Sequence, residues 1–304
     1  MAGQVLLGVS SAFYLVASVL YQCHFFARWR RWGRHAFPVA MAALAVHTAG
    51  FVLYIVQTGH PPFTSIFESL AFFAWCIVVV YLVAQRAHKI EVLGSIAFPL
   101  AFVALVSGLF ALAAGPSPAV GVKETPSTVL LIVHATPALL SYAAFFLALC
   151  AAVGYLFHAW LLRSKRLTRV QRALPSLDAL DAIAYRMVAV GFPLLTVGIV
   201  AGAVWYMYTR GATRGDYWGW VTQEMWTMVT WLIYAVYLHA RMVAGWKRTS
   251  SQWLLVAGFA VVLVTYLVAH LWLPGVHQPG GEAAHALPAV FTGAGSPSGA
   301  PLDV

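Results

Sequence analysis

Histidine and tryptophan occur together where this 304-residue chain leaves or enters its apolar stretches. His134 lies near one end of a long apolar stretch, and His277 follows the last stretch. Between them in the sequence is the segment 217–226, whose large aromatic residues are Tyr217, Trp218, Trp220 and Trp226. Imidazole nitrogens bind haem iron, and flat aromatic rings suit the wide, apolar porphyrin. If the two histidines meet across this segment, they form a bis-histidine haem site.

Each part of this pattern also has a purely structural interpretation. Tryptophan and tyrosine gather at membrane interfaces because their rings are amphipathic, and an interfacial histidine is often simply hydrated. The set of iron ligands stays open, because His60 and His270 fall near the same predicted side of the membrane. Arg210 and Arg214 are available to pair with the two propionates of a porphyrin.

The composition predicts that a membrane protein carries these residues. Of the whole chain, 62% is hydrophobic and 9% is charged, whereas soluble proteins carry roughly 25% charged residues. A soluble fold needs more polar cover than this chain offers, so a soluble enzyme is excluded. The net charge of +9 does not indicate nucleic-acid binding, because the basic residues form short clusters between apolar runs, as membrane topology dictates.

The apolar segments set the expected architecture, because a helix needs about 20 mostly apolar residues to cross a bilayer. They cover approximately residues 4–26, 36–57, 68–85, 90–113, 129–157, 181–208, 225–243 and 253–273. We therefore predict an all-α fold, a polytopic membrane helix bundle of about eight transmembrane helices. The first segment is interpreted as a retained helix, because no basic region precedes it as in a signal peptide.

The lysines and arginines predict how the bundle is oriented. If the segments alternate in direction, all but three of the 18 basic residues fall on one side, the exceptions being Lys123, Arg210 and Arg214. Basic connections stay in the cytoplasm, so we expect both termini outside. His134, His277 and the 217–226 segment then share the outer face.

Other histidines fall inside the predicted membrane segments. His239 lies close to the cytoplasmic end of 225–243, and His47 lies near the middle of 36–57. Ionisable groups within the membrane suggest function. A neutral histidine can instead form a hydrogen bond to a neighbouring helix, and we favour that structural interpretation for His47 and His270.

The remaining regions carry little chemistry. We expect residues 1–277 to form one transmembrane domain with a tryptophan-rich outer loop at about 205–226. The tail 278–304 is rich in Gly, Ala and Pro and is predicted to be disordered outside the membrane. Residues 158–180 suit an amphipathic helix on the inner surface. The cysteines form no CxxC motif and are interpreted as small buried residues: Cys23, Cys76 and Cys150.

The aromatic motif carries a family resemblance. It consists of Tyr217-Trp218-Gly219-Trp220, then Glu224 and Trp226, then Trp231-Leu232-Ile233-Tyr234-Ala235-Val236-Tyr237-Leu238-His239. This segment, from Trp205 onward, resembles the signature of the CcsA/ResC cytochrome c assembly proteins, which belong to the haem-handling superfamily with the WWD domain. Residues 59–70, 140–145 and 273–277 are similar to the family as well.

The resemblance implies a function in a bacterial cytoplasmic (inner) membrane. Haem b would cross the membrane with the help of His239, and His134 and His277 would then hold it beneath the tryptophan-rich loop. A membrane partner of the ResB/CcsB type would complete the unit. The held haem would be joined by thioether bonds to the CxxCH cysteines of apocytochrome c.

The chain also departs from the family pattern. Val221-Thr222-Gln223 stands where the family has Asp-Pro-Lys, and Arg214 replaces a tryptophan. Whether the chain acts as a component of a cytochrome c haem lyase therefore stays open. One alternative is a HemX-like regulator or scaffold of haem metabolism without ligation activity. Another is a transporter or a b-type electron-transfer subunit, in which His47 and His239 could form a ligand pair.

Overall fold

The computed structural model describes residues 2–26, 30–59, 63, 66–88, 90–113, 126–164, 174–210, 222–246 and 249–271. Within these ranges all regular secondary structure is helical, which confirms the all-α prediction. The helices are α1 (Ala2–Phe26), α2 (Arg30–Thr58), α3 (Ile66–His88), α4 (Glu91–Ala113), α5 (Pro126–Arg163), α6 (Leu177–Arg210), α7 (Thr222–Met242) and α8 (Thr249–Leu271).

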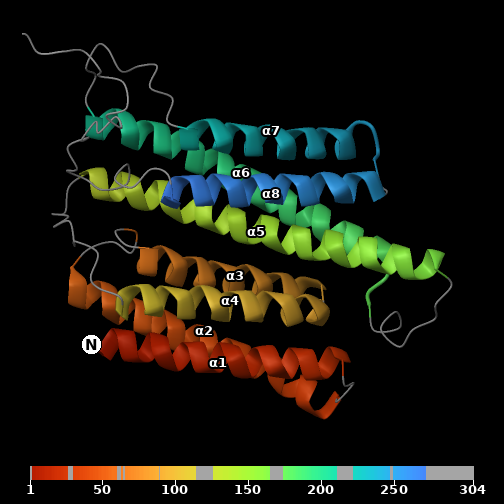
Figure 1. Ribbon diagram of the computed structural model, residues 1–304, viewed down its shortest axis with the longest axis horizontal. Helices are drawn as coiled ribbons and strands as arrows, with labels where there is room; N and C mark the ends of the chain where they lie inside the picture. The colour runs from red at the N-terminus through yellow and green to blue at the C-terminus, as the bar shows by residue number, and fades with distance from the viewer. Residues whose placement is uncertain are drawn as a thin grey trace, which may run out of the picture.

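The helices lie side by side in two groups, α1 to α4 and α5 to α8 (Figure 1). Consecutive helices form the closest pairs, α1 with α2, α3 with α4, and α5 with α6. The two groups meet mainly where α3 packs against α5. Helix α5, which carries His134, therefore packs against helices of both groups.

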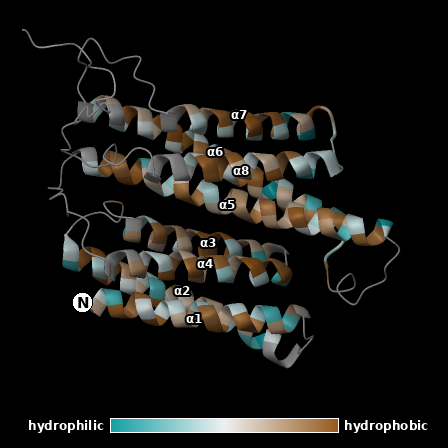
Figure 2. Ribbon diagram, viewed as in Figure 1, coloured by the Kyte–Doolittle hydropathy of each residue, from teal (hydrophilic) through white to brown (hydrophobic). Residues whose placement is uncertain are grey.

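Hydropathy supports a multi-pass membrane protein. Of the described helices, α1 to α6 are long and apolar enough to cross a membrane, and α8 contributes the shorter apolar stretch Thr249–Thr265. Figure 2 shows hydrophobic residues along the middle of most helices and hydrophilic residues toward several of their ends. That all eight helices span the membrane, with both termini outside, stays a prediction.

Helices α2, α5 and α6 extend at both ends beyond the apolar segments from which they were predicted. Helix α6 runs to Arg210 and α7 begins at Thr222, so Trp205 and Trp226 are helical residues rather than parts of a loop. The surface helix expected at 158–180 is wrong at its ends, because residues 158–163 continue α5 and residues 177–180 begin α6. Residues 165–173 lie outside the described residues. The tail 278–304 also lies outside them.

Small residues bring α5 and α6 into close contact. A Cβ atom added at Gly191 would lie 2.7 Å from the Phe145 ring, and one added at Gly198 would lie 3.2 Å from the Cβ atom of Ala138. Glycine lets membrane helices approach closely, which improves their van der Waals packing. The antiparallel register that results places the C-terminal part of α6 directly against His134.

Candidate functional site

The predicted site residues divide between described and undescribed parts of the chain. His134, Trp226 and His239 lie in helices whose side chains are described. His277, Tyr217, Trp218 and Trp220 lie outside the described residues. The convergence of His134 and His277 on one haem therefore stays a prediction.

His134 lies in the first part of α5, eight residues after the helix begins at Pro126. At about 1.5 Å per residue, this places it ~12 Å along the helix. Pro137 lies inside the same helix, and proline has no N–H to bond the carbonyl four residues earlier. The sequence thus marks this turn of α5 as unusual, although membrane helices tolerate proline.

A hydrogen bond determines which ring nitrogen of His134 carries the proton. Its Nδ1 atom lies 2.7 Å from the carbonyl oxygen of Gly198 on α6. A carbonyl oxygen only accepts hydrogen bonds, so Nδ1 carries the proton and donates it. The neutral ring then keeps its lone pair on Nε2, the atom that would bind a metal. His134 is held in a tautomer suited to iron.

Helix α6 also shapes the space around the His134 ring. A Cβ atom added at Gly202 would lie 2.6 Å from Nδ1 of His134, so the imidazole occupies space that only glycine leaves free. The Trp205 ring lies parallel to the imidazole, with 3° between the planes and 6.4 Å between the ring centroids. The C-terminal part of α6 thus places backbone and one aromatic ring beside His134.

Helix α7 is fixed against α5 and α6 by residues of the aromatic motif. The indole Nε1 of Trp231 donates a hydrogen bond to Oγ1 of Thr196, at 3.0 Å. The Tyr234 ring stacks on Phe145, with ring centroids 3.7 Å apart. Trp226 is half-buried near the start of α7. The two contacts determine its position along the bundle axis relative to His134.

His239 lies at the other end of α7, three residues before Met242. Helices α5 and α7 begin at the same end of the bundle (Figure 1), so His134 and His239 lie near opposite ends. The His239 side chain is exposed on the surface of the bundle. Any haem bound there would be accessible from outside this chain.

An ion pair anchors this end of α7. Arg241 donates to Asp181 of α6 at 2.9 Å, and Nε2 of Gln252 of α8 donates to the same carboxylate at 2.6 Å. Both charged side chains are largely buried, with 7% and 14% exposed. The position of the helical turn that carries His239 is therefore well defined.

His47 has a structural partner. Its Nδ1 atom lies 2.7 Å from the hydroxyl of Tyr14 on α1, and its side chain is fully buried in the α1 to α4 group. This confirms the interpretation of His47 as a residue bonded to a neighbouring helix. It also contradicts a His47–His239 ligand pair, because His239 is exposed on a helix of the other group.

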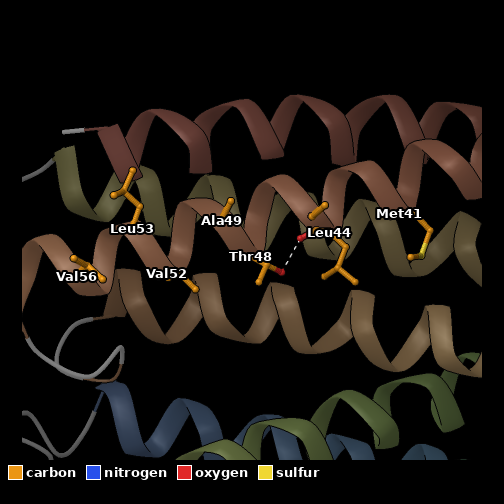
Figure 3. Close-up of a pocket in the computed structure, with 8 residues that line it drawn as sticks. Met41, Leu44, Thr48, Ala49, Val52, Leu53 and Val56 are labelled. Atoms are coloured by element: carbon orange, nitrogen blue, oxygen red, sulfur yellow. Dashed lines mark hydrogen bonds between the residues drawn. The ribbon is translucent and has the colours of Figure 1, made fainter.

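The described surface offers a groove that does not involve any of the predicted ligands. It has a volume of about 710 Å³ and is lined by α2 residues from Met41 to Val56 (Figure 3). Its one hydroxyl, on Thr48, donates to the carbonyl of Leu44 and accepts from Trp75. The described ranges also contain no cluster of three or more His, Cys, Asp or Glu side chains suited to a metal ion.

Sequence reasoning missed the part that α6 plays at His134. Gly198 and Gly202 form a G-x-x-x-G pattern in an apolar helix, which is a known signal for close helix packing. That pattern could have predicted a close helix contact. It could not have indicated that the contact is with His134, because that depends on the α5–α6 register.

This helical bundle contains a histidine whose proton position is set by a neighbouring helix, and α7 carries part of the aromatic motif. These features define a class of helical membrane proteins, and comparisons with known proteins give the family. The family model described as "Cytochrome C assembly protein" matches residues 63–277. This chain belongs to the cytochrome c assembly protein family, as its resemblance predicted.

The relatives are similar along most of their length. The cytochrome c biogenesis protein CcsA of Gloeothece citriformis is 30% identical, with 82% of this chain and 92% of the relative covered. The CcsA protein of Chlorella vulgaris is 32% identical, with 79% and 84% covered. That of Synechococcus elongatus is 29% identical, with 82% and 91% covered.

Proposed function

We propose that this chain binds haem b at the outer face of a bacterial cytoplasmic membrane and presents it for attachment to apocytochrome c. The single observation that carries the proposal is the hydrogen bond from His134 to Gly198, since it leaves Nε2 free for iron. Membership of the cytochrome c assembly family supports the same conclusion. The relatives are named for cytochrome c biogenesis.

The second outer ligand is proposed to be His277. The segment with Tyr217, Trp218 and Trp220 would cover one face of the porphyrin, together with Trp226 at the start of α7. The motif residues Trp231 and Tyr234 fasten α7 to the helices beside His134. This arrangement supports a site in which the loop and His134 act together.

His239 is proposed to bind haem before it reaches the outer face. A histidine supplies one axial ligand, so a six-coordinate iron at His239 needs a second ligand from elsewhere. Because the His239 side chain is exposed, a membrane partner of the ResB/CcsB type can supply it. The ion pair between Arg241 and Asp181 would keep the turn that carries His239 in position for that partner.

The chemistry required of the protein is mainly positioning. In thioether formation each cysteine thiol adds across a haem vinyl group: the S–H bond and the vinyl π bond break, one S–C and one C–H bond form, and nothing leaves. The chain's own residues would hold haem in one orientation, and the aromatic loop would exclude water. The ligands of the cytochrome would then displace the chain's histidine side chains from the iron. A held, correctly oriented haem raises the effective concentration of the reacting groups.

The second candidate is a HemX-like regulator or scaffold that binds haem without ligation. The observation that favours it is Val221-Thr222-Gln223 in place of Asp-Pro-Lys. This replacement removes an acidic and a basic residue from the loop that would face the cytochrome.

A maturation assay separates the two candidates. The chain is expressed with its partner in a strain that lacks its own assembly proteins, and covalent haem on a reporter cytochrome c is measured by haem staining. The assembly function predicts covalent haem that is lost in the H134A variant. Haem-loaded chain with no maturation, in the presence of a functional partner, would favour the regulator.

A further inference from the structure

We propose that Gly202 and Trp205 are positioning residues, which hold the His134 ring in one orientation and one proton form and thereby tune the iron it binds. This inference rests on the proposed function, because it requires His134 to be an iron ligand. It adds a role for α6, which contributes no iron ligand of its own.

The three α6 residues around His134 lie on one face of the helix. Gly198, Gly202 and Trp205 are spaced by four and then three residues, and residues at such spacing are neighbours on a helix surface. The carbonyl of Gly198 accepts the hydrogen bond from His134, Gly202 leaves room for the imidazole, and the ring of Trp205 lies parallel to it. Each acts on a different property of the same imidazole.

Gly202 gives the ring its access to the Gly198 carbonyl. An added Cβ atom would lie 2.6 Å from Nδ1 and 2.7 Å from Cε1 of His134. Both distances are far below ordinary van der Waals contact, so any side chain at this position forces the ring away. The hydrogen bond at 2.7 Å would then lengthen or break, and Nδ1 would no longer be selected as the protonated atom.

Trp205 limits the rotation of the imidazole. The torsion that turns a histidine ring about its Cβ–Cγ bond is soft, so a hydrogen bond at one atom leaves some freedom. The parallel indole plane, 3° from that of the imidazole, removes part of this freedom. The orientation of the imidazole plane over the porphyrin would follow from this contact.

The hydrogen bond should affect the iron itself. A carbonyl that accepts from Nδ1–H makes Nε2 a stronger base and favours the ferric state. Loss of such a partner commonly costs ~10–100-fold in metal affinity. The G202A variant should therefore bind haem ~10–100-fold more weakly, and its bound haem should have a raised reduction potential.

Matched glycine variants of the same helix pair test this role. G191A places a Cβ atom 2.7 Å from Phe145, so it disturbs α5–α6 packing as strongly as G202A but away from His134. G154A meets only Leu180, at 3.5 Å, and should be silent. We expect the reduction potential and the haem spectrum to stay unchanged in G154A and to change much more in G202A than in G191A, because G191A reaches the site only through the contact between Phe145 and Tyr234. Equal changes in G202A and G191A would show a merely structural role and overturn the inference.

A measurement on the haem-free protein adds a readout that does not depend on binding. Nitrogen NMR of histidine-labelled protein, with the His134 signals identified by their loss in H134Q, reports which ring nitrogen carries the proton. The wild type should show Nδ1–H alone, W205F should retain it, and W205L and G202A should show both tautomers. A single unchanged tautomer in W205L and G202A would remove both residues from this role.

Failure of the proposed function can be distinguished from failure of the positioning role. Wild-type protein that binds no haem refutes the proposed function and, with it, the tuning of iron by α6. Wild-type protein that binds haem while G202A and W205L match it in potential and spectrum refutes the positioning role alone. The Gly191 and Gly154 variants show whether the helix pair tolerates an added methyl group.

Discussion

The rings of Phe145 on α5 and Tyr234 on α7 lie face to face, with 3.7 Å between their centroids and 10° between their planes. Phe145 follows His134 by three helical turns, and Tyr234 follows Trp226 by about two turns. This stack therefore couples the depth of the candidate iron ligand to the depth of the aromatic motif.

The contact between Phe145 and Tyr234 gives a prediction that distinguishes the contribution of the Tyr234 ring to stability from that of its hydroxyl group. The Tyr234 hydroxyl is buried without a hydrogen-bond partner among the described residues, and burying an unpaired polar group costs about 1–3 kcal/mol. Y234F should thus be neutral or stabilising, whereas Y234A removes the ring and should cost about 3–5 kcal/mol. Thermal unfolding in one detergent compares the two. A Y234F variant as unstable as Y234A would mean that the hydroxyl, rather than the stack, holds α7.

The hydrogen bond between Trp231 and Thr196 gives a second prediction. W231F keeps a ring but loses the donor, and T196V loses the acceptor, so each should cost about 0.5–1.5 kcal/mol. The double variant should cost less than the two single changes together, because both remove the same bond. Unfolding of the three variants checks this. Fully additive losses would show that the bond contributes nothing.

The ion pair between Asp181 and Arg241 gives a third. Both side chains are largely buried, so removal of one partner leaves a buried charge and should cost about 3–5 kcal/mol. D181A and R241A should each be strongly destabilised, and D181A/R241A should be less destabilised than their sum. A double variant at or beyond that sum would show that the charges act independently.

For His239 we predict a substitution that leaves stability unchanged but lowers haem content. Its side chain is exposed, so H239A should change stability by less than about 0.5 kcal/mol, as most surface substitutions do. Haem content of the chain copurified with its partner should nevertheless fall, because a ligand is lost. Stability and haem content are measured on the same preparation. Retained haem in H239A would exclude the residue from the delivery route.

The helices were largely predictable, because apolar length is encoded locally. The segment 90–113 corresponds to α4 at Glu91–Ala113. The segment 36–57 missed seven residues of α2, which runs from Arg30 to Thr58. Hydropathy detects the apolar middle of a helix, whereas the backbone continues into its polar ends. The loop predicted at about 205–226 overlapped the predicted segment 181–208, and the structure resolves the overlap, because α6 continues through Trp205 to Arg210.

The candidate site was predictable only in part. The residue types are read directly from the sequence, and the outer location of His134 is a prediction from the distribution of basic residues. Its protonated atom and its contact with Gly202 depend on the α5–α6 register, which periodicity does not give. His47 illustrates the same limit, since only tertiary packing shows that Tyr14, 33 residues away, is its partner.

The most direct test of the account is the reduced-minus-oxidised absorption spectrum of the purified chain, compared among the wild type, H134A and H158A. His158 is a matched control, because it lies on the same helix and its Nδ1 also bonds a backbone carbonyl, that of Pro175 at 3.0 Å. We expect a haem signal in the wild type and in H158A, and its loss or a change of ligation in H134A. A wild-type protein without haem under haem-replete expression, or an H134A spectrum identical to that of the wild type, would contradict the account.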